Sequence, residues 1–295
     1  MTGTLKTKRV RASEMKQRIQ LRKEKKKEKK QERLEGKPKQ TPKTIESMRI
    51  KDETMITDLE SEENIEVKND IDNDEFSNYF EKAYIPKILI TTSDNAQSKT
   101  RKFCKELTRI IPNSIAKCRS RMDVKPMVKE AINRGFSDVI IINENQKMPN
   151  GLLLIHLPNG PTANFRLSNV RLTSEMKKTH KEFNKHRPEV ILNNFSTRLG
   201  YTISRMLAAL FHYEPEFRGR RCVTFHNQRD YIFFRHHRYM FTKDAKPRLM
   251  ELGPRFTLKL RSLQLGTFDT KTGEYEWIIQ NHRHDMETSR RKFFL

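Results

Sequence analysis

The stretch ELGPRFTLKLRSLQLG at residues 251–266 contains the clearest β-strand pattern in the chain. Between residues 255 and 261 apolar and polar residues alternate, and successive side chains of a strand point to opposite faces of a sheet. One face then holds Phe256, Leu258 and Leu260. The other face holds Arg255, Thr257, Lys259 and Arg261. The segment therefore predicts a strand that packs on one side and presents three cations, roughly 7 Å apart, on the other.

Upstream of this strand, the apolar pattern predicts an α/β unit. The expected elements are a strand at 86–93, a helix at 103–111, a helix at 125–134, a strand at 138–142, and a hairpin of strands 152–157 and 162–167. The strands are short apolar runs, and the helices repeat apolar residues at helical spacing. Ser93 offers capping chemistry before the first helix. Gly135 suits a left-handed C-cap after the second, on whose inner face we expect Met127, Val128, Ala131 and Ile132.

A second segment repeats the order of strand, amphipathic helix and hairpin. Its expected elements are a strand at 190–192, a helix from 197 to 211, a hairpin of strands 222–225 and 231–234, and strands at 255–260 and 275–279. Ser196 or Thr197 can cap the helix. The two segments share the order of their elements but not their residues, and this repeated order predicts an internal duplication. We expect two similar halves, at about 84–170 and 187–281, with a cleft between them.

The charge of the chain points to a polyanionic partner. Its 295 residues include 60 Lys+Arg against 37 Asp+Glu, a formal net charge of +23. Each phosphate that a cation neutralises releases condensed counterions, so nucleic acid is the leading partner and an anionic membrane surface is the rival. No apolar run approaches the roughly 20 residues that span a bilayer. The charged N-terminus lacks the apolar segment of a secretory signal, so we expect an intracellular protein.

The first 83 residues read as a charged extension. Residues 1–39 hold 16 Lys+Arg and 5 Asp+Glu, whereas residues 52–75 hold 11 acids and one lysine. Such a composition buries too little apolar surface to offset the entropy of ordering, so the extension is expected to be largely mobile. Residues 14–35 are an exception, because they suit a solvated helix.

The basic run at residues 22–30 has more than one interpretation. Lys25, Lys26 and Lys27 could contact phosphates, or the run could be a nuclear address. The same run could be nothing more than a solvated charged helix. The acidic stretch at 52–75 could mask the basic arm or dock on a basic partner, but a plain linker is the simpler interpretation.

No motif in the sequence marks a catalytic or metal site. There is no phosphate loop, Gly-x-Gly-x-x-Gly, His-Glu-x-x-His or nucleophile elbow. His236 and His237 are adjacent, so a strand directs them to opposite faces. Asp138 and Glu144 bound an apolar strand and are expected at its solvent-facing ends rather than in a nuclease site. The three cysteines lack paired zinc spacing, so reduced thiols are expected. We therefore expect no enzyme, no cofactor and no metal.

Two further segments add candidate RNA contacts. Residues 231–241 interleave aromatic residues with Arg235 and Arg238, a mixture that can stack bases and hold phosphates. Ile232 and Phe234 within this segment are expected to belong to the core.

The hairpin strand at 162–167 also has a polar face. That face holds Thr162, Asn164 and Arg166, which could read the RNA backbone or base edges. These residues could equally do no more than solvate the sheet, and the same alternative applies to the cations of 255–261.

Five stretches resemble the Brix-domain family of ribosome assembly factors. They are PKILITTS at 86–93, RGFSDVIIINE at 134–144, LLLIHLPNGPTANFRLSNV at 152–170, RPEVILNNFSTRLG at 187–200 and ELGPRFTLKLRSLQLG at 251–266. Because all five stretches occur in the family's order, the resemblance is specific, whereas any one stretch alone would not be. The last is similar to the family's signature segment, carried here by Gly253, Pro254, Arg255, Phe256, Leu258 and Lys259. The family-like turn is Pro158, Asn159, Gly160 and Pro161.

The resemblance implies a domain of two similar α/β halves related to anticodon-binding domains. It also implies a nucleolar location, binding to precursor ribosomal RNA, a role in large-subunit assembly without catalysis, and a dedicated protein assembly-factor partner. The expected domain spans 84–281, after the charged extension and before a short tail at 282–295. The leading hypothesis is thus a non-catalytic rRNA-binding assembly factor. The alternatives are a protein-interaction adaptor with little RNA affinity and an RNA-processing enzyme.

Overall fold

The computed structural model describes residues 15, 17–27, 31, 41–51, 54–56, 65–119, 121–176, 185–269, 272–279 and 291–295. The chain divides into two compact units, residues 1–48 and 49–295.

In the first unit, residues 17–27 are helical and exposed, as the sequence predicts for this part of the basic arm. Lys25, Lys26 and Lys27 lie on this helix with exposed side chains. Most of the other residues between 14 and 35 lie outside the described part of the chain. A phosphate-binding role for the three lysines stays a prediction.

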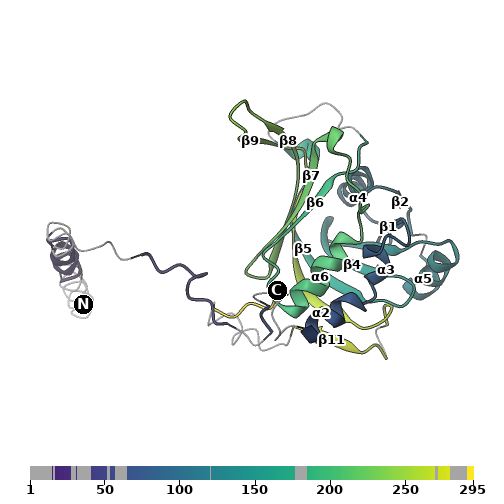
Figure 1. Cartoon of the computed structure of the whole chain (residues 1–295), viewed down its shortest axis with the longest axis horizontal. Helices are drawn as coiled ribbons and strands as arrows, with labels where there is room; N and C mark the ends of the chain where they lie inside the picture. Colours follow the sequence, from purple (N-terminus) through teal and green to yellow (C-terminus); the bar gives the residue numbers. More distant parts are fainter. Residues whose placement is uncertain are drawn as a thin grey trace, which may run out of the picture. The chain divides into compact units, whose positions relative to one another are not determined.

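The second unit is built around an 11-stranded mixed sheet in the order β2-β1-β3-β4-β5-β10-β8-β7-β6, with β9 paired to β8 and β11 paired to β10 (Figure 1). The strands are β1 (Ile88–Thr92), β2 (Ser114–Ala116), β3 (Asp138–Asn145), β4 (Met148–His156), β5 (Thr162–Arg171), β6 (Glu189–Asn193), β7 (Arg221–Gln228), β8 (Tyr231–Phe241), β9 (Pro247–Glu251), β10 (Arg255–Gln264) and β11 (Tyr275–Ile278). The helices are α2 (Ile65–Asp72), α3 (Ser77–Phe80), α4 (Ser98–Ile110), α5 (Val124–Asn133) and α6 (Arg198–Ala208), with short 3-10 turns η2 (Thr173–Glu175) and η3 (Phe217–Gly219). None of the described helices combines the length and apolar character needed to cross a membrane.

The first half of the sheet forms where its sequence predicts. β1 and β3 are buried parallel neighbours, and β3, β4 and β5 then run antiparallel to one another. One detail differs, because Ser93 does not cap the following helix. α4 begins five residues later, where Gln97 is the N-cap residue and its backbone N–H donates to the carboxylate of Glu144 at 2.9 Å.

The second half follows the same order. β6 and β7 are parallel, and β7, β8 and β10 then run antiparallel. Thr197 caps α6, since its hydroxyl oxygen accepts a hydrogen bond from the N–H of Gly200 at 2.9 Å. The turn between β7 and β8 is tighter than expected, with Arg229 and Asp230 both in the left-handed region.

The two halves therefore share one topology, which confirms the predicted repeat of α/β halves. In each half, a parallel pair of strands is followed by two antiparallel strands. β5 and β10 pair antiparallel with each other, so the halves join edge to edge in one continuous sheet. A shared hydrophobic core fills the space that the helices cover, and the halves enclose a hollow of about 420 Å³ beside it, lined by residues 108–115 of the first half and by Lys185, His186 and Arg221.

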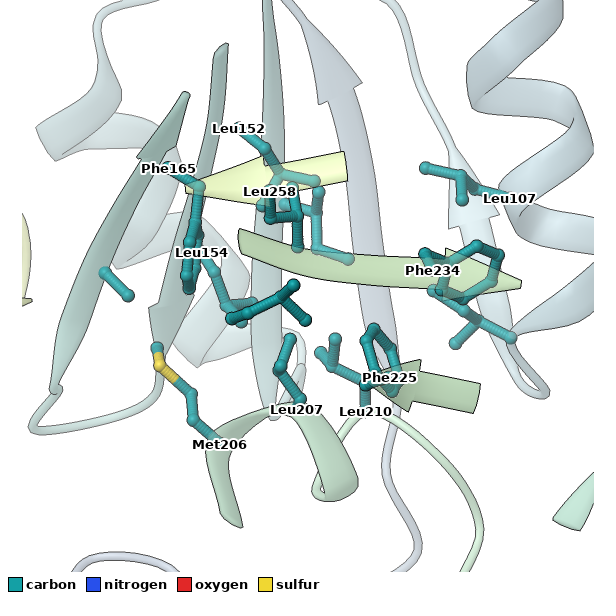
Figure 2. Packing of buried hydrophobic residues seen from close by; sticks show 14 of the residues in the cluster. Leu107, Leu152, Leu154, Phe165, Met206, Leu207, Leu210, Phe225, Phe234 and Leu258 are labelled. Carbon is teal, nitrogen blue, oxygen red and sulfur yellow. The ribbon is translucent and has the colours of Figure 1, made fainter. Parts of the chain in front are cut away.

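This shared core combines side chains of both halves with those of α4 and α6. Phe103 of α4 meets Phe256 of β10 edge-on, with 5.4 Å between ring centroids, and Phe256 stacks on Phe234 of β8 at 4.3 Å. Figure 2 shows Leu207 of α6 in the same cluster as Leu154 of β4. Phe103 of the first half thus packs against a strand of the second, and side chains of both halves meet in one core on this face.

The other face of the sheet is covered differently in the two halves. In the first half, α5 packs Met127, Val128 and Ala131 in a second cluster with Leu89 of β1. Ile132 lies at the margin of this helix face and is 37% exposed, so its predicted inward position is wrong. In the second half, the described chain from α6 to β7 contains η3 and no counterpart of α5. The outer face of β7, β8 and β10 therefore has no described helix over it.

The packed part of the second unit begins before residue 84, the expected start of the domain. Phe76 is fully buried and Tyr79 nearly so, and both belong to the shared core. Asp74 accepts two hydrogen bonds from the Arg205 guanidinium of α6, at 2.6 and 2.7 Å. Sequence analysis missed this segment because two aromatic side chains in an acidic stretch make no periodic pattern.

The last described residues pack back onto the domain beside the start of α6. Asp230 accepts hydrogen bonds from the backbone N–H groups of Phe294 and Leu295, at 2.8 and 3.0 Å. Thr197 donates its hydroxyl hydrogen to the carbonyl oxygen of Phe294 at 2.6 Å. Burial raises the pKa of the Asp230 carboxyl above its ordinary value, and these two N–H groups lower it in part. Residues 291–295 are thus part of the fold, whereas 280–290 lie outside the described residues.

Candidate nucleic-acid interface

The outer face of the sheet is most basic where the two halves join. β5, β8 and β10 are described throughout, and outside their bulges they direct cationic side chains and no Asp or Glu to this face. The cations are Arg166, Arg171, Arg235, Arg255 and Lys259. The apolar side chains that alternate with them are buried on the opposite face. The alternation predicted at 255–261 thus extends across three adjacent strands.

Strand register places these cations directly opposite one another. Lys259 of β10 is paired with Arg166 of β5, and Arg255 is paired with Arg171. Like charges directly opposite on neighbouring strands destabilise the pairing. Nearby acids compensate part of this repulsion, as Glu251 does for Arg255, and a bound polyanion would relieve what remains.

Aromatic side chains lie beside the cations on β8. Lys259 places its Nζ 4.8 Å from the ring centre of Tyr231, which is 41% exposed. The Arg235 guanidinium carbon lies 5.8 Å from the ring centre of Phe233. Alternating aromatic and cationic side chains can stack bases while holding phosphates. Ile232 and Phe234 are buried on the other face, as the sequence predicts.

Glu251 of β9 neutralises part of this charge. Its carboxylate forms an ion pair with Arg255 and lies 3.9 Å from Arg235. The pKa of Arg235 is lowered, first by burial and then by the neighbouring Arg255. Arg166 and Arg171 are exposed and lie on the other side of β10. Of the five cations, these two are therefore the most accessible to a ligand.

A hollow of about 520 Å³ lies over β6, β7 and β8, beside the cations. Its lining combines an apolar ring with hydrogen-bonding groups and includes Thr224, His226, Phe233, His237 and Leu249. Burial lowers the pKa of His237, so its ring is neutral at pH 7 and can donate one hydrogen bond and accept another. A hollow of this size and polarity suits a ring that carries both donors and acceptors.

Three of the predicted contacts do not join the exposed row of cations on the outer face. Thr257 is buried, at 3% exposure. Arg261 is the extra residue of a β-bulge between Leu260 and Ser262, so it leaves the row of cations. Arg238 faces the side of β8 opposite Arg235, because an odd number of positions separates them.

The polar face of β5 is only partly as predicted. Asn164 and Arg166 are exposed, and Asn164 is paired with Ser262 of β10. Thr162 is buried, and its hydroxyl donates to the carbonyl oxygen of Gly266 at 2.9 Å. Its role is therefore structural. Binding of RNA by Asn164 and Arg166 stays a prediction.

Sequence analysis missed Arg171 and His226 as candidate contacts. β5 has a register irregularity near Asn169, whose φ is +53°, and this shifts Arg171 onto the outer face opposite Arg255. His226 faces the hollow only because β7 and β8 extend beyond the short strands that the apolar pattern predicts. Both assignments require the strand register, which depends on the whole sheet and not on either strand alone.

Comparison with known proteins identifies the family. Residues 93–262 match the family model of the Brix domain. The chain belongs to the Brix-domain family of ribosome biogenesis factors. It is 63% identical over 261 residues to the probable ribosome production factor 1 of Drosophila melanogaster, and 54% identical over 258 residues to ribosome production factor 1 of Xenopus laevis. Each match covers 88% of this chain, and they cover 66% and 74% of those proteins.

These relatives confirm the resemblance drawn from the five stretches and place the chain beside ribosome production factor 1 within the Brix family. A crystal structure of a probable ribosomal biogenesis protein from Aeropyrum pernix K1 is a weaker likeness, with 15% identity and a TM-score of 0.46 over 66% of this chain and 99% of that one. It adds no weight to the assignment.

In the signature segment, the backbone between β9 and β10 adopts a left-handed conformation that glycine suits best. Gly253 has a φ of +73°, and a Cβ there would lie 3.2 Å from the Cα of Thr173. The imidazole of His236 fixes the position of Gly253, since its Nδ1 bonds the Gly253 carbonyl oxygen at 2.9 Å. Its Nε2 accepts a hydrogen bond from the Arg221 guanidinium at 3.2 Å. Pro254 follows, and β10 begins at Arg255.

The family-like turn has a structural role as well. Gly160 has a φ of +102°, and a Cβ there would lie 2.3 Å from the backbone of Gly266. The turn therefore lies directly against the end of the signature stretch 251–266. Both motifs fix how backbones approach one another in the Brix domain, and neither needs an RNA contact to explain its glycine.

The acids flanking β3 also have structural roles. Asp138 is fully buried, so its predicted solvent-facing position is wrong. It lies 2.7 Å from Nδ1 of His156 and accepts a hydrogen bond from the Ser137 hydroxyl at 2.8 Å. Burial lowers the pKa of His156, but the bond to Asp138 outweighs it, so the net pKa is raised. Glu144 binds the backbone at the start of α4.

Within the described part of the chain, no three His, Cys, Asp or Glu side chains gather closely enough to hold a metal ion. His236 is buried on the core side and His237 faces the hollow, so the adjacent histidines point to opposite faces as predicted. All three cysteines are free thiols.

Proposed function

We propose that this Brix-domain protein is a non-catalytic rRNA-binding assembly factor for the large (60S) ribosomal subunit. It acts in the nucleolus, binds precursor rRNA, and supports pre-rRNA processing together with a dedicated protein assembly factor and other pre-ribosomal proteins. The outer face of the sheet is the RNA-binding surface. The protein binds no membrane and no small-molecule substrate.

The opposed cation pairs are the observation that carries this proposal. Lys259 with Arg166, and Arg255 with Arg171, concentrate positive charge along the line where the halves join. The adjacent strands lie about 4.8 Å apart, so the pairs form a compact strip rather than scattered surface charge. A backbone of phosphates crossing this strip would replace repulsion with attraction and release counterions.

The neighbouring aromatic residues support RNA as the polyanion. Tyr231 and Phe233 lie beside Lys259 and Arg235, and single-stranded RNA stacks unpaired bases on such rings. An anionic membrane surface would be attracted by the cations, but it would not contact Phe233, whose ring lies in the hollow. The exposed lysines of residues 25–27 add a second basic element, which we propose contacts neighbouring RNA.

A scaffold role without catalysis agrees with what the acids do. Asp138 and Glu144 are occupied in holding His156 and the start of α4. Catalytic acids in a nuclease would instead converge beside the bound phosphates. The direct check is incubation of the purified protein with labelled pre-rRNA and a divalent metal, in which we expect no cleavage.

RNA binding is tested most sharply by reversing one opposed pair. In the double variant Arg166→Glu with Lys259→Glu, like charges still face each other across the strands, so the cross-strand repulsion in the free protein is retained. Affinity for single-stranded RNA should fall, and the slope of log K against log salt should shrink by about 0.7 for each phosphate that the protein no longer neutralises.

The matched control is Arg101→Glu with Lys105→Glu. It makes the same charge change at exposed positions of α4, on the opposite face of the sheet. We expect the control to bind more tightly than the Arg166/Lys259 variant. If the two variants lost the same affinity, the loss would be explained by net charge alone and not by the position of the cations. Unchanged binding by a folded Arg166/Lys259 variant would move the domain to the adaptor function, with RNA contacted elsewhere in the assembly.

A further inference from the structure

The hairpin of β8 and β9 extends past the end of β7 (Figure 1). β7 accompanies β8 as far as Arg238, and residues 239–241 then pair with 247–249 of β9. We call residues 238–250 the ribbon. The N–H of Thr242 donates to the carbonyl oxygen of Lys246 at 3.0 Å and closes its tip. Two strands alone are marginally stable in water, so a projecting ribbon gains stability from what it contacts.

The ribbon exposes large apolar side chains together. Met240, Phe241, Leu249 and Met250 are 54%, 66%, 61% and 41% exposed. Single exposed apolar residues are ordinary on protein surfaces, but a group of them marks an interaction site. The ribbon is therefore a contact element and not only a connection.

Strand alternation gives the ribbon two different faces. Phe241 shares its face with Tyr239 and Leu249, and the Tyr239 and Phe241 rings meet edge-on at 5.7 Å. This face continues the hollow on the outer side of the sheet, because Leu249 also lines that hollow. On the other face, Met240 is paired with Arg248.

Charge decides which kind of partner the ribbon fits. Its cations are Arg238, Lys243, Lys246 and Arg248, and its only acid is Asp244. The ribbon has an exposed ring on one face and cations at its tip and on its other face, a combination that can stack a base and hold nearby phosphates. The ribbon thus complements RNA better than it complements an apolar protein groove.

We propose that the ribbon inserts into folded rRNA at an unpaired nucleotide, whose base stacks on Phe241 while Lys243 and Lys246 at the tip and Arg248 on the other face hold phosphates of the surrounding backbone. This inference rests on the proposed function and adds selectivity to it. The opposed cations of the sheet bind phosphates wherever a backbone passes, whereas stacking on Phe241 requires a base that is free of the helix. The ribbon therefore gives the protein a preference for bulges and junctions over continuous duplex.

The test uses the full chain with two fluorescein-labelled probes, an RNA duplex and the same duplex carrying a bulge of unpaired nucleotides. The wild-type protein should bind the bulged probe more tightly. Phe241→Ala should lose roughly tenfold in affinity for the bulged probe, the scale of one base–aromatic stack, and should bind the plain duplex nearly as before. Phe217→Ala is the matched control, since Phe217 on η3 is also 66% exposed, and it should keep the preference.

The cations are tested by the triple variant Lys243→Ala, Lys246→Ala and Arg248→Ala. It should weaken binding to both probes and flatten the salt dependence. The control removes three exposed cations from α4, with Arg101→Ala, Lys102→Ala and Lys105→Ala, and should retain more affinity than the ribbon variant. All variants are compared by thermal unfolding, and surface positions on a projecting hairpin should leave the midpoint nearly unchanged.

The outcomes separate the inference from the proposed function. If Phe241→Ala keeps the wild-type preference while Arg166→Glu with Lys259→Glu loses binding, the ribbon inference is overturned and RNA binding by the sheet stands. If the wild-type protein binds neither probe, both proposals fail. If ribbon variants bind both probes normally but no longer co-purify with pre-ribosomal proteins, the ribbon is a protein-docking element and the inference is again overturned.

Discussion

At residue 160 the chain passes so close to Gly266 that a single methyl group would collide with backbone. A Cβ there would lie 2.3 Å from the carbonyl carbon of Gly266, and φ is +102°. Gly135 also has a left-handed φ, of +67°, but the space around it is open. The two glycines thus separate the cost of the backbone conformation from the cost of close approach.

We predict that Gly135→Ala lowers the free energy of unfolding by about 1 kcal/mol, the usual cost of a left-handed alanine. Gly160→Ala should lower it by more than about 3 kcal/mol, since the turn must also move away from residue 266. Chemical denaturation of both variants measures the difference. Equal destabilisation would show that the turn adjusts freely and that the close approach is not needed.

The buried pair of Asp138 and His156 makes stability depend on pH. Burial lowers the pKa of His156, but its hydrogen bond to Asp138 raises the pKa more, so the folded value lies above the ordinary one. A raised histidine pKa contributes stability below the unfolded pKa of about 6.5, and that contribution is lost as the pH rises through the folded pKa.

We therefore predict that the contribution of this pair to the free energy of unfolding falls as the pH rises above about 6.5. Asp138→Asn should be less stable by about 3 kcal/mol or more at pH 6, because it leaves a buried imidazole without its carboxylate, and its pH dependence should be flatter. Denaturation curves across this pH range test the pair. Parallel curves for the two proteins would contradict the assignment.

Among the elements, α6 depends on one capping residue that serves two purposes. Thr197 accepts from the N–H of Gly200 and donates to the carbonyl oxygen of Phe294. We predict that Thr197→Ala lowers the free energy of unfolding by about 2 kcal/mol, since it removes both hydrogen bonds, whereas Thr197→Ser is destabilised much less. Thermal unfolding measures both variants. If the serine variant is as damaged as the alanine variant, the methyl group rather than the hydroxyl is what matters.

Element positions were predictable wherever an apolar pattern was regular. α4, α5, α6, β1, β3 and the two hairpins lie where the sequence indicates, because each buries one regular face. β2 and β9 were missed, since β2 has three residues and β9 exposes nearly all of its side chains. α2 and α3 were missed because their anchoring residues, such as Phe76, lie within acidic sequence.

The candidate interface was predictable only in part, for reasons that are also physical. Alternation correctly placed Arg255 and Lys259 on the outer face of β10. It could not place Arg261, because a β-bulge shifts the alternation by one residue, and it could not pair Lys259 with Arg166, because register between distant strands depends on the whole sheet. The opposed cations that carry the proposed function were therefore visible only in three dimensions.

For the whole molecule, the central fact is that two similar halves share one core and differ in what covers their outer faces. Phe103 of the first half packs on Phe256 of the second, and β5 pairs with β10. The first half places α5 over its outer face, whereas the described second half does not. In the described part of the chain, the second half therefore leaves the outer face of its strands without a covering helix, and this is the face to which we assign RNA binding.

We predict that the halves unfold together. Phe256→Ala removes a ring that touches both halves and should lower the free energy of unfolding by about 3 to 5 kcal/mol. In hydrogen exchange, β3 of the first half and β7 of the second should lose protection to the same extent in this variant. A loss of protection confined to β7 would show that the halves have separate stabilities despite their shared core.

The measurement that tests the central claim most directly is in-cell UV crosslinking, with the crosslinked RNA sequenced and the crosslinked residues mapped on the chain. The account predicts crosslinks to large-subunit precursor rRNA from the outer face of β5, β8 and β10, and from the ribbon. Crosslinks from the basic arm alone, with none from these strands, would contradict it and leave the Brix domain as a protein-docking module.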